Sequence, residues 1–263
     1  MTQLKGLGEL DFALYISLIS LYLQNPLDHV YMLYDLIYEL DKTELYISGR
    51  GDVVEAYMLI WRGQKYSGIH LWNYSEDFKR LLKEALPAII QLYRPSDLEK
   101  VAGALKEAGV EFKAEVYLDM VVDEERFRPY RPQEAVRLDP GRYVGEFVEL
   151  KKAQGADIDE RQAVELIKKR RCYGVFKDGR LVSITCRYVA LPEVWIIGDV
   201  FTLPEYRGHG YGKIATSAIT RDAVASGAVA YLHVNKKNVA ATSLYAKLGY
   251  SILRERPWIF APP

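Results

Sequence analysis

Hydrophobic residues recur with a helical period over the first 40 residues of the chain. The spacing predicts helices over 7–24 and 26–40, the second with Pro26 in its first turn. The segment from Leu10 to Leu23 is apolar, but about 14 residues are too few to span a bilayer. No small-residue cleavage site follows it. We therefore expect a buried N-terminal helix in a cytoplasmic protein.

A strand pattern replaces the helical one after the second helix. Short β-rich runs predict strands at 45–48, 53–61, 67–72, 88–93 and 112–122. A helix is expected before the last of these strands, with Ser96 as its N-cap, Glu99 three residues later and Gly109 at its end.

The second half of the chain repeats this order of helix, hairpin, strand, helix and strand. Residues 123–133 are charged and contain Pro129 and Pro132, which is typical of a domain junction. We therefore expect two domains, 1–128 and 129–263. Their class is α/β (α+β), with a mixed, mostly antiparallel sheet flanked by helices.

Composition excludes several classes of function. The 35 Lys and Arg residues balance the 35 Asp and Glu residues, so no global field attracts nucleic acid or an anionic membrane. The two cysteines, Cys172 and Cys186, flank an expected hairpin, and we predict a reduced, buried pair. The histidines are scattered, with no two of them four residues apart, so we expect no metal site.

The segment from Arg207 to Gly212, Arg-Gly-His-Gly-Tyr-Gly, has the composition of a phosphate-binding turn. It follows a β-rich run that ends at Pro204 and precedes a helix that begins near Lys213. A helix N-terminus offers unpaired N–H groups and a partial positive charge to phosphate oxygens, and glycines let the backbone approach them closely. Arg207 and Lys213 add positive charge.

Glycine spacing alone does not identify the ligand of this turn. A dinucleotide-binding turn needs a parallel βαβ unit and an acidic residue about 20 positions later. Here the preceding strands are expected to form an antiparallel meander, and residues 228–232 contain no acid. The pattern therefore disfavours a dinucleotide.

Two ordered motifs resemble signatures of the Gcn5-related N-acetyltransferase (GNAT) superfamily. The turn is similar to its Arg/Gln-x-x-Gly-x-Gly motif. The run from Asn238 through Ala241, Leu244 and Tyr245 is similar to its Asn-x-x-Ala-x-x-Leu-Tyr-x-Lys-Leu-Gly-Phe segment, with Tyr250 for the usual Phe. The resemblance implies a GNAT acyl-CoA N-acyltransferase fold, with acetyl-CoA or another acyl-CoA as co-substrate.

The stretch from Thr202 to Arg207 resembles more narrowly the glycine N-acyltransferases and the FR47-like group. Their first half also opens with Asn-Pro, as Asn25-Pro26 does here. In the first half of this chain, Tyr-Arg-Pro-Ser-Asp at 93–97 takes the place equivalent to the glycine turn. The first half is therefore expected to be a degenerate GNAT-like domain that binds no coenzyme.

The resemblance implies direct attack of an amine on the thioester in a ternary complex. The coenzyme would lie where two strands diverge, with backbone groups of Phe201 and Thr202 polarising the thioester carbonyl. Tyr245 is expected to protonate the leaving thiolate as general acid, with a core tyrosine as the alternative. Asn238 is expected to reach the pantetheine or to cap its helix. The residues expected to contact the coenzyme are Phe201, Thr202, Arg207, Gly208, His209, Gly210, Tyr211, Gly212, Lys213, Asn235, Asn238, Ala241 and Tyr245.

At the position of the general base, this sequence departs from the family pattern. Many members place a glutamate where this chain has Ile196. The nearest acids are Glu193 and Asp199, and strand alternation points the Asp199 side chain to the face opposite Ile196. The base is therefore expected to be Glu193 or Asp199, to act through a water chain, or to come from elsewhere. His209 is expected to face the phosphates.

These observations predict an acyl-CoA-dependent N-acyltransferase, a monomer or homodimer, that acts on a primary amine of a small molecule or peptide. Two alternatives stay open. A non-catalytic acyl-CoA-binding regulator would account for the isoleucine at Ile196, and a protein or peptide N-terminus would replace the small molecule as acceptor.

Overall fold

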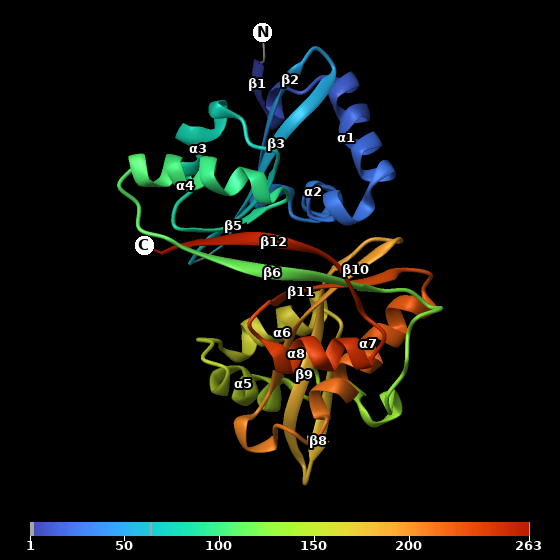
Figure 1. Ribbon diagram of the computed structural model, residues 1–263. Helices are drawn as coiled ribbons and strands as arrows, with labels where there is room; N and C mark the ends of the chain where they lie inside the picture. Colours follow the sequence, from blue (N-terminus) through green and yellow to red (C-terminus); the bar gives the residue numbers. More distant parts are fainter. Residues whose placement is uncertain (1–2, 64, 263) are drawn as a thin grey trace. The chain divides into compact units, whose positions relative to one another are not determined.

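The chain folds into two compact units, each with strands in a sheet and helices packed against them (Figure 1). The computed structural model describes residues 3–63 and 65–262. The strands are mixed and mostly antiparallel, which confirms the α/β (α+β) class expected from the sequence. None of the helices in these ranges is long and apolar enough to cross a membrane.

The division between the units differs from the expected one at residues 128 and 129. The second unit spans Asp119–Leu253, and the last residues of the chain, from Arg254, return to the first unit. The chain leaves the first unit within strand β6 (Lys113–Val122) and re-enters it within strand β12 (Ser251–Ala261). Sequence signals such as proline mark loops, whereas strand pairing decides which unit a terminal strand joins.

The first unit is a twisted sheet with helices against it. Its helices are α1 (Phe12–Gln24), α2 (Pro26–Tyr38), α3 (Lys79–Glu84) and α4 (Leu98–Glu107), and its further strands are β1 (Gln3–Gly6), β2 (Thr43–Arg50), β3 (Val53–Arg62), β4 (Ser67–Trp72) and β5 (Ala88–Leu92). The strand order is β1-β2-β3-β4-β5-β12. Strands β4 and β5 are parallel, and the other neighbouring pairs are antiparallel. The core includes Met58, Ile69, Phe78, Ile90 and Leu105.

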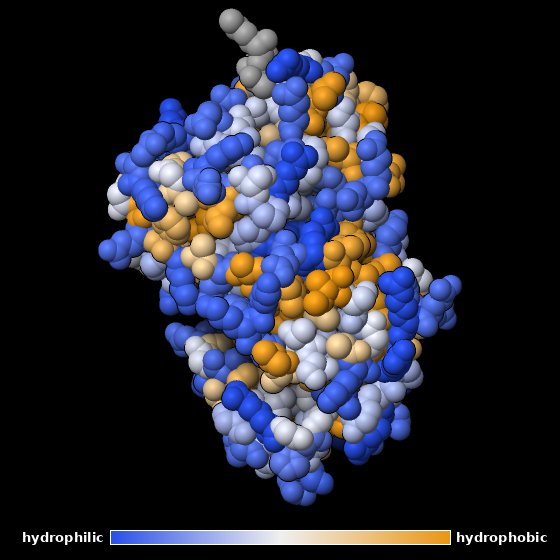
Figure 2. Space-filling model, viewed as in Figure 1, coloured by the Kyte–Doolittle hydropathy of each residue, from blue (hydrophilic) through white to orange (hydrophobic). Residues whose placement is uncertain are grey.

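Helix α1 has one buried and one exposed apolar face, so the expectation of a buried N-terminal helix is wrong for the exposed face. Leu14 and Leu18 are buried, whereas Phe12 is 80% and Leu23 is 68% exposed. Figure 2 shows hydrophobic side chains over α1 at the upper right of the view. The sequence could not separate the two faces because both carry large apolar residues.

The second unit has the order β6-β11-β10-β9-β8-β7. Its helices are α5 (Val144–Ala153), α6 (Glu160–Lys169), α7 (Tyr211–Ala225) and α8 (Val239–Lys247), and its further strands are β7 (Val136–Arg137), β8 (Cys172–Lys177), β9 (Arg180–Ala190), β10 (Val194–Thr202) and β11 (Val229–Asn235). Strands β10 and β11 are parallel, as expected for strands joined through helix α7, and β7 to β10 form an antiparallel meander. Helices α7 and α8 lie side by side (Figure 1).

Single turns of 3-10 helix join several of these elements. They are η1 (Leu7–Glu9), η2 (Leu40–Lys42), η3 (Glu76–Phe78), η4 (Pro95–Asp97), η5 (Pro132–Glu134) and η6 (Pro204–Tyr206).

Cys172 and Cys186 form a disulfide, so the expectation of a reduced pair is wrong. The two residues are direct register partners on the antiparallel strands β8 and β9. Their Cα atoms are 4.1 Å apart, which brings the two side chains together on one face of the sheet. The expected hairpin is therefore confirmed, and the register it produces is what joins the sulfurs.

Candidate functional site

The glycine turn leads directly into helix α7. Gly208 and Gly210 have φ angles of 83° and 85°, in the left-handed region that favours glycine. Gly210 is the N-cap of α7 and has no side chain that could cap the helix. The first intrahelical bond of the turn runs from Ile214 N–H to Gly210 O at 3.0 Å. The turn therefore directs the first N–H groups of α7 outward, as a phosphate-binding site requires.

A cavity of about 600 Å³ opens in front of this helix terminus. It is lined by Val200, Phe201, Thr202, Tyr206, Arg207, Gly208, Gly210, Tyr211, Gly212, Lys213, Asn238, Ala240, Ala241, Ser243, Leu244 and Lys247. These include every residue predicted to contact the coenzyme except His209, Asn235 and Tyr245. The additional residues on α8, Ala240, Ser243, Leu244 and Lys247, follow one another at helical spacing and so share one face of the helix.

Two cationic side chains of the turn line the cavity and are held in place. Arg207 Nε donates to the Thr202 carbonyl oxygen at 3.2 Å. The Lys213 ammonium lies 3.3 Å from the centroid of the Tyr130 ring, a cation–π contact that the sequence did not indicate. Lys247 of α8 lines the cavity as well. Three cations around a helix N-terminus fit an anionic ligand such as a pyrophosphate.

Strands β10 and β11 diverge beside this cavity. Their parallel register covers Val194–Ile196 on β10 and Val229–Tyr231 on β11. Further along β10, Phe201 and Thr202 pair with β9 on the other side, and both line the cavity. The Thr202 hydroxyl bonds to the Ser183 hydroxyl at 2.8 Å. The β10 segment that lines the cavity therefore lies beyond the point where the two central strands part.

The two asparagines of the second motif hold the backbone. Asn238 Oδ1 accepts from Ala241 N–H at 3.1 Å, so it is the N-cap of α8 as well as a cavity residue. Asn235 Oδ1 accepts from Lys237 N–H at 2.9 Å in the preceding turn. Of the two roles expected for Asn238, helix capping is therefore present in the structure.

The glycine at the end of the second motif is required by close backbone packing. Gly249 has a φ of 96°, and a Cβ atom built on it would lie 2.0 Å from the Arg126 carbonyl oxygen. The neighbouring Leu248 carbonyl accepts from Arg128 N–H at 2.9 Å. Any larger residue at Gly249 would push the 126–128 segment away from the end of α8.

Tyr245 lies on α8 behind the cavity wall. Its side chain is buried, 6% exposed, and burial raises the pKa of its phenol above the ordinary value. Its ring centroid is 5.9 Å from that of Tyr250, whose hydroxyl bonds to Thr220 Oγ1 at 2.7 Å. Within the described residues the Tyr245 hydroxyl has no hydrogen-bond partner. The phenol is therefore protonated at neutral pH and available to donate.

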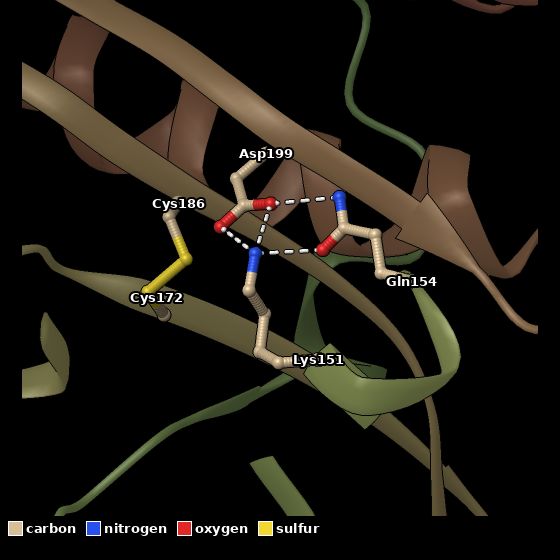
Figure 3. Close-up of polar contacts among 5 residues, drawn as sticks. All are labelled: Lys151, Gln154, Cys172, Cys186 and Asp199. Carbon is tan, nitrogen blue, oxygen red and sulfur yellow. Dashed lines mark hydrogen bonds and ion pairs between the residues drawn. A yellow bond between two sulfur atoms is a disulfide. The ribbon is translucent and has the colours of Figure 1, made fainter. Parts of the chain in front are cut away.

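Asp199 is held in a buried ion pair (Figure 3). Its carboxylate accepts from Lys151 Nζ at 2.8 and 3.0 Å and from Gln154 Nε2 at 3.1 Å. The carboxylate is 4% exposed and the ammonium 12%. These contacts tie α5 to β10 and occupy both carboxylate oxygens.

The side of the sheet to which Asp199 points differs from the expected one. Gly198 is the register partner of Cys186, and Figure 3 shows the disulfide and Asp199 on the side from which Lys151 approaches. Asp199 has a φ of 53°, and the register shifts between Gly198 and Phe201. This β-bulge turns Asp199 toward the same face as Gly198 and Ile196, so the strand-alternation prediction is wrong here.

The other two candidates for proton transfer lie away from the fork between β10 and β11. Glu193 is exposed in the β9–β10 turn, five residues before Gly198, which is roughly 17 Å along a strand. His209 is exposed in the glycine turn, where its Nδ1 bonds to the Arg207 carbonyl at 2.9 Å and its ring stacks on Tyr211. Neither side chain is placed beside the diverging strands.

A histidine that the sequence analysis did not single out lies beside the fork. His233 Nδ1 is 2.6 Å from Asp119 Oδ1, and the Tyr231 hydroxyl donates to Asp119 Oδ2 at 2.5 Å. Asp119 is fully buried. The signal in the sequence was the alternation Tyr231-x-His233 on a strand whose other residues before Asn235 are apolar. Its partner Asp119 is 114 residues earlier, so only the fold could reveal the pair.

Metal-binding residues do not cluster in the part of the chain that the structure describes: no group of three or more His, Cys, Asp or Glu side chains could hold an ion there.

Comparison with known proteins agrees with this geometry. The acetyltransferase (GNAT) family model matches residues 141–250. None of the curated proteins compared with the chain matches it.

Solved structures with the same architecture match nearly the whole chain. A Drosophila protein matches 99% of this chain and 98% of its own, with 15% identity and a TM-score of 0.70. A tandem GNAT protein from the clavulanic acid biosynthesis pathway matches 98% of both chains, with 14% identity and a TM-score of 0.62. A GNAT-family acetyltransferase from Colwellia psychrerythraea matches 99% of this chain and 100% of its own, with 15% identity and a TM-score of 0.60. At these identities the similarity concerns the fold, and it covers both units. The family match over residues 141–250, which include the glycine turn and α8, identifies this part of the chain as a GNAT acetyltransferase domain.

Proposed function

We propose that this protein transfers the acetyl group of acetyl-CoA to a primary amine of a small molecule, by direct attack of the amine in a ternary complex. The observation that carries the proposal is the cavity formed by the glycine turn, the N-terminus of α7 and α8. Its volume of about 600 Å³ lies within the range of small-molecule sites. Its cations and outward N–H groups suit the pyrophosphate of the coenzyme.

The cations, outward N–H groups and close packing at the cavity wall support a coenzyme site here. Gly212 packs so closely that a Cβ atom would lie 3.1 Å from Thr202 Oγ1 and 3.5 Å from Leu244 Cδ1, at the cavity wall. We assign Arg207, Lys213 and the α7 N–H groups to the pyrophosphate. Backbone groups of β10 near Phe201 and Thr202 are assigned to the thioester carbonyl. One such donor contributes roughly 3 kcal/mol to the stabilisation of an oxyanion.

Tyr245 is proposed as the general acid for the leaving thiolate. Its position on α8, its protonated phenol and its unengaged hydroxyl support this role. The first unit is proposed to bind no coenzyme, because η4 (Pro95–Asp97) takes the place of the glycine turn there.

The experiment measures binding and chemistry separately on the purified full chain. Isothermal titration calorimetry with acetyl-CoA measures binding, and free-thiol release across a panel of small primary amines measures transfer. We expect binding, together with amine-dependent thiol release. Binding without thiol release from any amine or peptide would instead support a non-catalytic acyl-CoA-binding regulator. Release with peptides alone would assign the acceptor to a protein or peptide N-terminus.

A further inference from the structure

The geometry points to His233 as the general base that takes the proton of the acceptor amine, with Asp119 orienting it. This inference rests on the proposed function. It assigns the general base, a role that the isoleucine at position 196 cannot fill. It is carried by three features: the hydrogen bonds of His233, its place along β11, and the face of the sheet to which it points.

The hydrogen bonds fix the tautomer of the imidazole. Asp119 is fully buried and accepts from the Tyr231 hydroxyl at 2.5 Å on one oxygen, and its other oxygen lies 2.6 Å from His233 Nδ1. An ionised carboxylate accepts, so Nδ1 carries the proton and Nε2 carries the lone pair. A buried carboxylate also stabilises the imidazolium that forms when Nε2 takes up a proton. The carboxylate therefore makes His233 a stronger base at Nε2.

The place along β11 puts His233 at the point where the central strands part. The last residues in register are Ile196 and Tyr231. His233 lies two residues beyond Tyr231 on the same face, since alternate residues of a strand point the same way and both side chains bond to Asp119. Gly198 stands two residues beyond Ile196 on the facing strand, and the Tyr188 ring packs against it, since a Cβ atom built on Gly198 would lie 2.2 Å from Tyr188 Cε2.

The face to which His233 points is the one away from α7. Trp195 lies under the Arg171 guanidinium, which pairs with Asp222 of α7 at 2.9 Å, so Trp195 faces α7. Ile196 follows it and faces away, and its register partner Tyr231 does the same.

The coenzyme cavity, in contrast, lies on the α7 and α8 side of the fork. An acyl group that enters the fork from the cavity therefore meets an amine on the His233 side.

The acids considered from sequence are placed less suitably. Both oxygens of Asp199 are engaged by Lys151 and Gln154. Glu193 lies at the far end of β10. His233 is the ionisable side chain on β10 or β11 that combines a fixed orientation with a position at the fork.

The protons balance as follows. His233 Nε2 takes one proton from the acceptor ammonium and later releases it to solvent. The neutral amine nitrogen forms a bond to the thioester carbon, and the carbon–sulfur bond breaks with its electron pair going to sulfur. A second proton of the amine ends on the sulfur by way of the Tyr245 phenol, which gives one proton and regains one. The products are the amide and the free thiol.

The test uses His233→Gln and Asp119→Asn in the full chain, with Tyr173→Phe as a matched control. Tyr173 donates to Asp222 at 2.8 Å, so the control removes a tyrosine–aspartate bond of the same kind away from the fork. With an amine whose conjugate acid has a high pKa, kcat/KM should fall about 100-fold or more for His233→Gln. The fall should be smaller for an amine that is already neutral. The Kd for acetyl-CoA should stay within twofold, and Tyr173→Phe should keep the wild-type rate.

Three results would contradict either the role of His233 or the proposed function. Equal losses for amines of high and low pKa, or a loss under threefold, would overturn the role of His233 as base. If His233→Gln lowered kcat/KM and the affinity for acetyl-CoA by the same factor, His233 would be needed for the folding of the fork. That result would also overturn the inference. A wild-type chain that releases no thiol with any amine contradicts the proposed function itself.

Discussion

The ion pair between Lys151 and Asp199 allows a test of how much a buried charge contributes to the stability of the second unit. Replacing Lys151 with Met leaves a carboxylate that is 4% exposed without its cation. Removal of one partner from a buried pair costs about 3–5 kcal/mol, because the remaining charge is neither solvated nor paired. The two bonds from Lys151 Nζ to the carboxylate, at 2.8 and 3.0 Å, place this pair in that class and not among surface pairs, which contribute about 1 kcal/mol or less.

The assay is urea unfolding followed by far-UV circular dichroism. Lys151→Met should lower the unfolding free energy by about 3–5 kcal/mol, and the double variant Lys151→Met/Asp199→Asn, which removes the charge and keeps a side chain that tolerates the positive φ of 53°, should recover more than half of that loss. The exposed pair Arg180–Glu205, at 3.0 Å, serves as control, and Arg180→Met should cost under about 1 kcal/mol. A single-variant cost below about 1 kcal/mol would refute the reasoning about burial.

The same variants also distinguish a structural Asp199 from a catalytic one. If the carboxylate only ties α5 to β10, Asp199→Asn and Lys151→Met should change kcat to similar, small extents per folded molecule. A 100-fold loss confined to Asp199→Asn would restore Asp199 as the base and contradict the assignment of His233.

Three further outcomes test the site and the fold. Gly210→Glu should raise the acetyl-CoA Kd at least 100-fold in calorimetry by placing a carboxylate at the helix N-terminus; Gly227→Glu, which replaces a glycine of φ 83° at the other end of α7, should leave Kd unchanged. Tyr245→Phe should lower kcat at least tenfold with little change in Kd, whereas Tyr250→Phe, which loses the bond to Thr220, should lower stability and not kcat; an unchanged kcat in Tyr245→Phe would remove its acid role. Burial lowers the pKa of His29 from 6.5 to about 4, so the unfolded chain binds more protons between these values and stability falls as pH drops from 6.5 to 4. His29→Gln should remove up to about 3 kcal/mol of this pH dependence in unfolding experiments, and an unaltered slope would contradict the burial argument.

The sequence by itself determined most of the residues that line the cavity at the glycine turn. The turn from Arg207 to Gly212 and the run from Asn238 are contiguous in the chain, and each residue's role follows from local backbone geometry. Glycines at Gly208 and Gly210 are needed where φ is positive, and a helix N-terminus binds anions wherever it occurs. Local chemistry of this kind can be predicted from spacing alone.

The tertiary structure decided the features that depend on long-range pairing. The bulge at Asp199 reverses a side chain that strand alternation points the other way, and the register of β8 with β9 joins Cys172 to Cys186. The pairing of His233 with Asp119 spans 114 residues and depends on which strands become neighbours. Register and strand order are set by the packing of the whole sheet, so no local pattern contains them. The glycine turn could therefore be predicted from the sequence, whereas the contact between His233 and Asp119 became visible only in the fold.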